Sequence, residues 1–165
     1  DAYTDQHPRI AHLRTQLPPQ LRRYAGILID LSFDHYLSVH WSRFSDIELS
    51  RFNASVYAAL AANRDQLSTG SQRMLERLEE HDILNLYHDW HTVTATAERI
   101  GERFRGANPF TDIAASISAT RANMESAFLD FYPQLQHLQH CVVAPSEGAN
   151  GNARRYCKAR QKLLV

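Results

Sequence analysis

The sequence predicts an all-α protein that folds as a single-domain helical bundle. Only 6 glycines and 6 prolines interrupt its 165 residues, so long segments are free of helix breakers. Within these segments apolar residues recur at steps of three and four, which is the period of one helix face. Alternation of β-branched and polar residues, which is typical of strands, is scarce. A chain of this length suits one domain with a sizeable core.

The breakers and the apolar stripes divide the chain into six predicted helices. We expect them over residues 9–16, 19–44, 45–65, 71–80, 86–104 and 113–133. The first two follow prolines, which are tolerated in the first turn of a helix. The third begins at Ser45-Asp46-Ile47-Glu48, which has the pattern of a capping box. The fourth follows a turn at residues 68–70.

The fifth predicted helix has the clearest apolar stripe in the chain. Its members are Leu86, Trp90, Val93, Ala97, Ile100 and Phe104. The sixth helix should stop near Tyr132-Pro133, because the residue before a proline disfavours helical backbone. These helices form one predicted domain over residues 1–140, and a basic C-terminal tail follows over residues 141–165.

The charge balance favours no class of charged partner. Lys and Arg together number 18, as do Asp and Glu, so the formal net charge is zero. Neither a nucleic acid nor an anionic membrane is therefore expected as a partner. No apolar run reaches the roughly 18 residues that a membrane-spanning helix needs. Two cysteines, Cys141 and Cys157, are too few for a disulfide framework. Two free thiols in the cytoplasm fit best, and a single disulfide between them stays open.

Polar residues interrupt the apolar pattern of the second predicted helix. Asp30 and Asp34 are four residues apart and share a face, and His35 lies about 100° further round. Carboxylate oxygens combined with imidazole suit Mn²⁺, Mg²⁺, Fe²⁺ or Zn²⁺. The same residues can instead be ordinary helix residues that bond to neighbouring turns.

The N-terminus contains a second polar group: Asp1, Asp5 and His7. If this segment packs on the second helix, three or more oxygen and nitrogen ligands meet there. Otherwise it is a loop with a helix-capping residue.

Three segments resemble the acyl carrier protein phosphodiesterase family in their order and spacing. They are TDQHP, RRYAGILIDLSFDHYLSVHW and FLDFYPQL, and the resemblance covers residues 1–140. It implies an HD-domain-like helical fold, in a divergent branch of the HD phosphatase and phosphodiesterase superfamily. It also implies a bacterial, cytoplasmic hydrolase that uses a divalent metal, most typically Mn²⁺. The implied reaction cleaves the phosphodiester between 4′-phosphopantetheine and a serine of holo-acyl carrier protein, which yields apo-acyl carrier protein.

The resemblance also implies roles for single residues. The expected metal ligands are Asp34, His35, Asp5 and Asp1. Catalytic roles are expected for His35, His40 and Asp30. Substrate contacts are expected for Arg22 and Arg23, whose charge suits an acidic carrier protein, and for Trp41.

The sequence departs from the family pattern at its beginning. The family carries an N-terminal segment with further expected metal ligands, and this sequence starts at Asp1, after that segment. We therefore expect an N-terminally incomplete chain that is weakly active or inactive. Two other functions stay open: an HD-type phosphohydrolase that acts on nucleotides, and a helical fragment that serves as a binding module and needs no metal.

Overall fold

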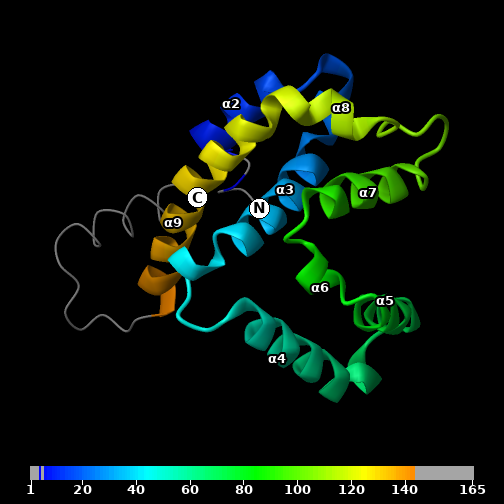
Figure 1. Ribbon diagram of the computed structural model, residues 1–165, viewed down its shortest axis with the longest axis vertical. Coiled ribbons are helices and arrows are strands. Elements are labelled where there is room, and N and C mark those ends of the chain that lie inside the picture. Colours follow the sequence, from blue (N-terminus) through cyan, green and yellow to red (C-terminus); the bar gives the residue numbers. More distant parts are fainter. Residues whose placement is uncertain (1–3, 5, 144–165) are drawn as a thin grey trace, which may run out of the picture.

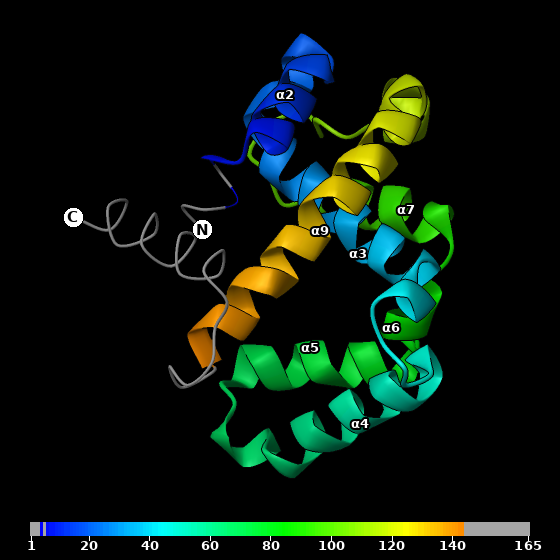
Figure 2. The same ribbon diagram turned by 90° about the vertical axis from the view of Figure 1, so that its left-hand side faces the viewer.

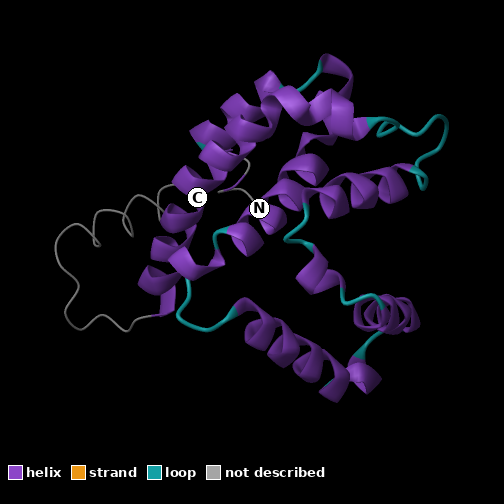
Figure 3. Ribbon diagram, in the orientation of Figure 1, coloured by secondary structure: helices purple, strands orange, loops and turns teal. Residues whose placement is uncertain are grey.

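A computed structural model describes residue 4 and residues 6–143 of the chain. All regular elements in this part are helical, and it contains no strand (Figure 3). The prediction of an all-α fold is therefore confirmed. The longer elements are α2 (Pro8–Gln16), α3 (Ala25–Val39), α4 (Leu49–Ala62), α5 (Thr69–Glu80), α7 (Trp90–Gly101) and α9 (Arg121–Val143). The shorter ones are η1 (Pro19–Tyr24), η2 (Trp41–Arg43), η3 (Arg64–Gln66), α6 (Ile83–Leu86), α8 (Ile113–Ile117) and η4 (Ser118–Thr120).

Helix α3 runs through the middle of the molecule and packs on both α7 and α9 (Figure 1). Helix α2 lies along α9, and α8 packs on α7. The core lies between these helices, and Leu28, Val93, Ile113 and Met124 have no exposed surface there. Burial of each such side chain stabilises the fold by roughly 1.5–3 kcal/mol relative to exposure, which holds α3 in place.

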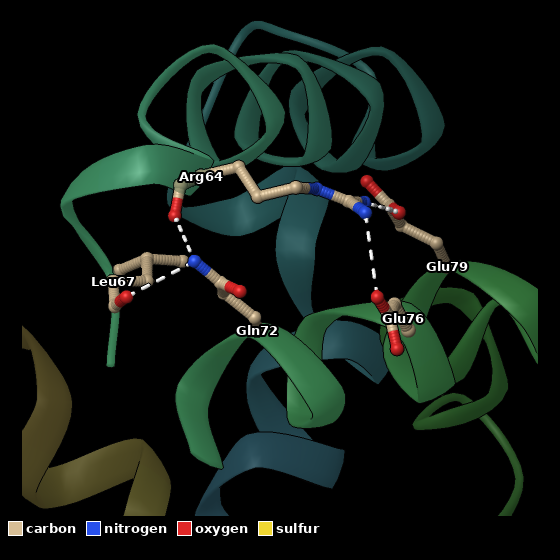
Figure 4. Close-up of polar contacts among 5 residues, drawn as sticks. All are labelled: Arg64, Leu67, Gln72, Glu76 and Glu79. Carbon is tan, nitrogen blue, oxygen red and sulfur yellow. Dashed lines mark hydrogen bonds and ion pairs between the residues drawn. The ribbon is translucent and has the colours of Figure 1, made fainter. Parts of the chain in front are cut away.

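Helices α4 and α5 form a hairpin that projects away from this core (Figure 2). Polar contacts close the tip of the hairpin (Figure 4). The Arg64 guanidinium lies 2.8 Å from Glu79 and 3.6 Å from Glu76 on α5. The Gln72 amide donates to the carbonyls of Arg64 and Leu67, at 3.0 and 3.1 Å. Arg64 and Gln72 thus connect the end of α4 to the face of α5.

The predicted capping box at residues 45–48 is wrong. The Ser45 hydroxyl accepts from the backbone N–H of Ile47, at 3.2 Å, and so forms a tight turn before any helix begins. Helix α4 starts at Leu49, and Glu48, at its N-cap position, makes no side-chain capping bond. The local pattern was satisfied by a turn because Ser side chains bond equally well to nearby non-helical backbone.

The predicted continuous helix over residues 86–104 is also wrong. It breaks at residues 87–89 between α6 and α7, where the Asp89 carboxylate accepts from the backbone N–H of His91, at 2.9 Å, and caps α7. Leu86 consequently lies outside α7 and is 48% exposed. The part of the predicted apolar stripe that lies in α7 does face the core, since Val93 and Ala97 are fully buried.

The last helix does not stop at Tyr132-Pro133 as predicted. Helix α9 continues through Pro133 to Val143, past the predicted domain boundary at residue 140. A proline inside a helix removes one backbone hydrogen bond. Tyr132, just before it, packs its ring on Phe44 at 4.9 Å, and Gln134, just after it, donates its amide to the carbonyl of Asp130 at 2.8 Å. The ring contact holds this part of α9 against the core despite the lost bond.

The predicted tail at residues 141–165 lies largely outside the described residues, which end at Val143. None of the helices in the described part of the chain has the length and apolar character needed to cross a bilayer.

Candidate functional site

Helix α3 positions the polar residues that the sequence singled out. One side of the helix is apolar and faces the core through residues such as Leu28 and Tyr36, which are 0% and 2% exposed. Asp30 and Asp34 are exposed on the other side, one helical turn apart. The pattern of apolar and polar residues along α3 therefore places both carboxylates at the surface.

Asp34 holds its proton more tightly than an ordinary aspartate. Removal of water by the surrounding protein, and then the negative charge of Asp30, raise the pKa of the Asp34 carboxyl to about 6. Asp34 remains an exposed residue, so solvent screens part of this effect. Two carboxylates that repel each other at one surface favour a proton or a cation as a third partner.

His35, next along α3, is buried and held by one specific hydrogen bond. Its Nδ1 lies 2.8 Å from the backbone carbonyl of Tyr87, in the break between α6 and α7. A carbonyl only accepts, so Nδ1 carries the proton. Burial lowers the pKa of His35 and keeps the ring neutral near pH 7. The Nε2 lone pair is therefore available, and Nε2 makes no hydrogen bond within the described part of the chain.

The surroundings of His35 bring together the starts of two other helices. The ring of Trp90, the first residue of α7, lies edge-on to His35 with its centroid 5.1 Å away. The guanidinium of Arg121, the first residue of α9, lies 4.6 Å from the centroid of the Trp90 ring. The Tyr36 hydroxyl donates to the Arg121 carbonyl, at 2.8 Å.

The sequence did not predict Trp90 and Arg121 as site residues. Trp90 belongs to an apolar stripe, which predicts a core residue. Arg121 is 85 residues from Tyr36 in the chain, and no local pattern marks it. Only the packing of α7 and α9 on α3 places them beside His35.

His40 occupies a different environment from Asp34 and His35. It caps the C-terminus of α3, and its Nε2 lies 2.8 Å from Glu125 Oε1 on α9. Its ring stacks on Phe128, with centroids 6.4 Å apart. Nε2 is therefore already engaged, and a catalytic role for His40 would require this pair to open.

The three predicted substrate-binding residues also have structural contacts. Arg22 donates to the carbonyls of Thr15 and Leu17, at 2.8 and 3.1 Å, and so caps the C-terminal end of α2. The Arg23 guanidinium lies 4.5 Å over the ring of the adjacent Tyr24 and is exposed. The Trp41 indole donates to the carbonyl of Ile47, at 2.6 Å, at the base of the α4–α5 hairpin.

The described residues do not by themselves form a metal centre. No group of three or more His, Cys, Asp and Glu side chains within residues 4 and 6–143 is arranged to hold an ion. The predicted ligands Asp1 and Asp5 lie outside the described residues. His7 lies on α9 instead: its Nδ1 accepts from the N–H of Arg9 and its Nε2 lies 3.3 Å from the Gln134 side-chain oxygen.

Comparison with known proteins identifies the family. A family model described as acyl carrier protein phosphodiesterase matches residues 1–135, which include α3 and most of α9. This chain belongs to that family. The family predicted from the three sequence segments is therefore confirmed.

Relatives named acyl carrier protein phosphodiesterase are about a quarter identical to this chain over the aligned 136 residues. Acyl carrier protein phosphodiesterase of Salmonella dublin is 26% identical over 136 residues, which cover 82% of this chain and 70% of the relative. The protein of the same name from Salmonella agona (strain SL483) is 25% identical with the same coverage. No solved structure matches the chain. The expected likeness to HD domains stays a prediction.

Proposed function

We propose that this protein hydrolyses the phosphodiester that joins 4′-phosphopantetheine to a serine of holo-acyl carrier protein. The family match over residues 1–135 is the observation that carries the proposal. The products are apo-acyl carrier protein and 4′-phosphopantetheine. The cytoplasm of a bacterium is the compartment that the resemblance implies for this reaction.

The residues on α3 supply chemistry that this reaction can use. Water attacks phosphorus, the bond from phosphorus to the serine oxygen breaks, and the serine oxygen takes up a proton. A neutral imidazole with a free lone pair can accept a proton from the attacking water. His35 has these properties, because its Nδ1–H is bound to the Tyr87 carbonyl and Nε2 is not engaged by the described residues.

We further propose that activity depends on a divalent cation, most typically Mn²⁺. This rests on the resemblance and on the oxygen and imidazole donors of Asp34 and His35, which suit such ions. Because Nδ1 of His35 is protonated, its single lone pair, on Nε2, can bind the cation or accept the proton but not both. Asp1 and Asp5 would have to add ligands, since the described residues alone do not gather three. A bound cation would neutralise phosphoryl oxygens and lower the pKa of a bound water.

Mass spectrometry of the substrate tests the proposed reaction. Holo-acyl carrier protein is incubated with the 165-residue chain and Mn²⁺, and loss of the prosthetic group is followed with time. We expect Asp34→Ala and His35→Gln to reduce the rate by at least about 100-fold, as loss of a metal ligand or of an acid–base group does. Circular dichroism of both variants should stay wild-type, and Arg73→Gln, an exposed change on α5, should retain full activity.

Two outcomes would contradict the proposal. One is a substrate that keeps its prosthetic group with Mn²⁺, Mg²⁺ and Zn²⁺ alike, both with this chain and with a version that carries the family's N-terminal segment. The other is hydrolysis of nucleotide phosphodiesters at rates that exceed those on the carrier protein, which would favour the nucleotide hydrolase. Full activity in excess chelator would remove the cation from the proposal and leave His35 with the proton-transfer role alone.

A further inference from the structure

Arg121 carries a positive charge that the contacts of the fold keep beside His35. Its guanidinium lies 4.6 Å from the Trp90 ring centroid, and the Trp90 ring lies 5.1 Å from the His35 ring. A guanidinium stacked on an indole gains both electrostatic and dispersion energy and loses conformational freedom. Arg121 is thus oriented in advance of any ligand.

The backbone of Arg121 is fixed as well. The hydroxyl of the buried Tyr36 donates to its carbonyl, at 2.8 Å, so α3 and the start of α9 are joined directly. This bond uses main-chain oxygen only. The bond to the carbonyl does not require the Arg121 side chain, although that side chain also interacts with the Tyr36 hydroxyl.

The nearest acidic residue along α9 does not neutralise Arg121. Glu125 follows one helical turn later, a position suited to an ion pair, but its carboxylate is paired with His40 at 2.8 Å. Within the described part of the chain no carboxylate lies within ion-pair distance of the Arg121 guanidinium. Arg121 is also exposed, so an anion from solution can reach it.

We propose that Arg121 binds the phosphoryl oxygens of the substrate diester, held for that purpose on the ring of Trp90. Stacking occupies the face of the guanidinium and leaves its N–H edges for two parallel hydrogen bonds to a phosphate. The phosphorus atom would then lie between this cation and the Nε2 lone pair of His35. This role rests on the proposed function and names a substrate-binding residue for the same site.

Calorimetric titration with 4′-phosphopantetheine and with pantetheine isolates the phosphate contribution. Both are titrated into the wild-type chain, Arg121→Gln, Arg121→Lys and the exposed control Arg73→Gln, in one buffer that contains Mn²⁺. The measured quantity is the ratio of the two dissociation constants. We expect wild type and Arg73→Gln to prefer the phosphorylated ligand by the same factor. That factor should fall roughly 10- to 100-fold in Arg121→Gln, the loss expected for a hydrogen bond to a charged group.

Arg121→Lys separates the contribution of the planar guanidinium, with its two parallel N–H donors, from the contribution of the positive charge. Lysine keeps the positive charge but lacks the planar guanidinium. Its preference for the phosphorylated ligand should therefore lie between those of wild type and Arg121→Gln. Equal phosphate preference in wild type and Arg121→Gln would overturn the proposal, as would a wild-type protein with no preference at all. Far-ultraviolet circular dichroism should match wild type in each variant.

A kinetic measurement separates this inference from the proposed function. On holo-acyl carrier protein, kcat/KM of Arg121→Gln should fall by a similar factor, roughly 10- to 100-fold. A wild-type chain that cleaves no carrier protein, yet loses its phosphate preference in Arg121→Gln, would refute the proposed function and support the phosphate contact. Wild-type kcat/KM in Arg121→Gln would refute the contact and leave the function standing.

Discussion

Two adjacent residues of α3 respond to desolvation in opposite directions. Burial by the surrounding protein raises the pKa of the Asp34 carboxyl and lowers the pKa of the His35 ring. In both cases loss of water disfavours the charged form. The two shifts therefore have one physical cause, loss of water, and at His35 the Tyr87 carbonyl and the Trp90 ring form the surroundings.

Asp34→Asn should stabilise the metal-free protein at about pH 7. An acid whose pKa is higher in the folded state favours folding fully below its unfolded pKa, 3.8, and loses this contribution as the pH rises to about 6. At pH 7 the ionised Asp34 is therefore unfavourable relative to a neutral amide. We expect a gain of about 1 kcal/mol, which allows for solvent screening at an exposed residue.

Urea denaturation in the presence of a chelator measures this effect. The gain should be present at about pH 7 and close to zero at about pH 4, where the wild-type carboxyl is protonated. The same difference in unfolding free energy at both pH values would show that the charge of Asp34 is not its cause.

At the scale of elements, one asparagine holds the segment between α7 and α8. The Asn108 amide donates to the carbonyl of Glu98, at 2.9 Å, and its oxygen accepts from the N–H of Phe110, at 2.8 Å. Phe110 is thereby kept in the core, where its ring packs on Tyr24 at 5.4 Å. The C-terminal end of α7 is in this way connected to the start of α3.

Gly101→Ala should destabilise the fold although alanine is the better helix former. A Cβ at Gly101 would lie 1.8 Å from Asn108 Oδ1, so the asparagine would have to move and give up both hydrogen bonds. We expect a net loss of about 1–2 kcal/mol after the gain in helix propensity. Thermal unfolding followed by circular dichroism measures it.

Gly26→Ala is the matched control. Gly26 is an exposed residue in the first turn of α3, and a Cβ there meets nothing within 4 Å. It should stabilise the protein by about 0.5 kcal/mol, because only the conformational term changes. If both alanines shift the melting temperature in the same direction, the Asn108 contacts are not what retains glycine at position 101.

At the scale of the whole molecule, a net charge of zero cannot attract an acidic protein. Attraction has to come from local groups of cations. The fold gives different environments to the two arginines that are predicted to bind substrate. Arg22 is occupied in capping α2, whereas Arg23 is exposed and rests on Tyr24. Arg23 lies in η1, which leads directly into α3, the helix that carries Asp34, and we expect both to fall within the footprint of a small docked protein.

Arg23→Glu should raise KM for holo-acyl carrier protein about 3- to 10-fold at low ionic strength. The difference between variant and wild type should shrink as salt screens the charges. Hydrolysis of a small phosphodiester, which needs no docking surface, should be the same in both proteins. Unchanged KM at low salt would place the docking surface elsewhere. Arg22→Glu is a poor test, because it also removes the cap of α2.

The sequence by itself determined the helical class, the family and the face of α3 that carries Asp30 and Asp34. Each depends on residues close together in the chain: the three-to-four period of apolar side chains, or the continuous segment from Arg22 to Trp41. Predictions of helix boundaries from local sequence patterns failed where tertiary or other local contacts competed with the expected one. Ser45 formed a turn in place of a cap, and α9 passed through Pro133, where ring packing holds the helix against the core despite one lost hydrogen bond.

Only the tertiary structure decided how the candidate site is assembled. The His35 tautomer depends on the carbonyl of Tyr87, 52 residues away, and the position of Arg121 depends on Trp90 and Tyr36. It likewise decided that Glu125 pairs with His40, so that no carboxylate of residues 4 and 6–143 forms an ion pair with Arg121. Periodicity says which face of a helix is buried, but not which distant helix covers it. Protonation and charge pairing at the site therefore follow from the packing of α7 and α9 on α3.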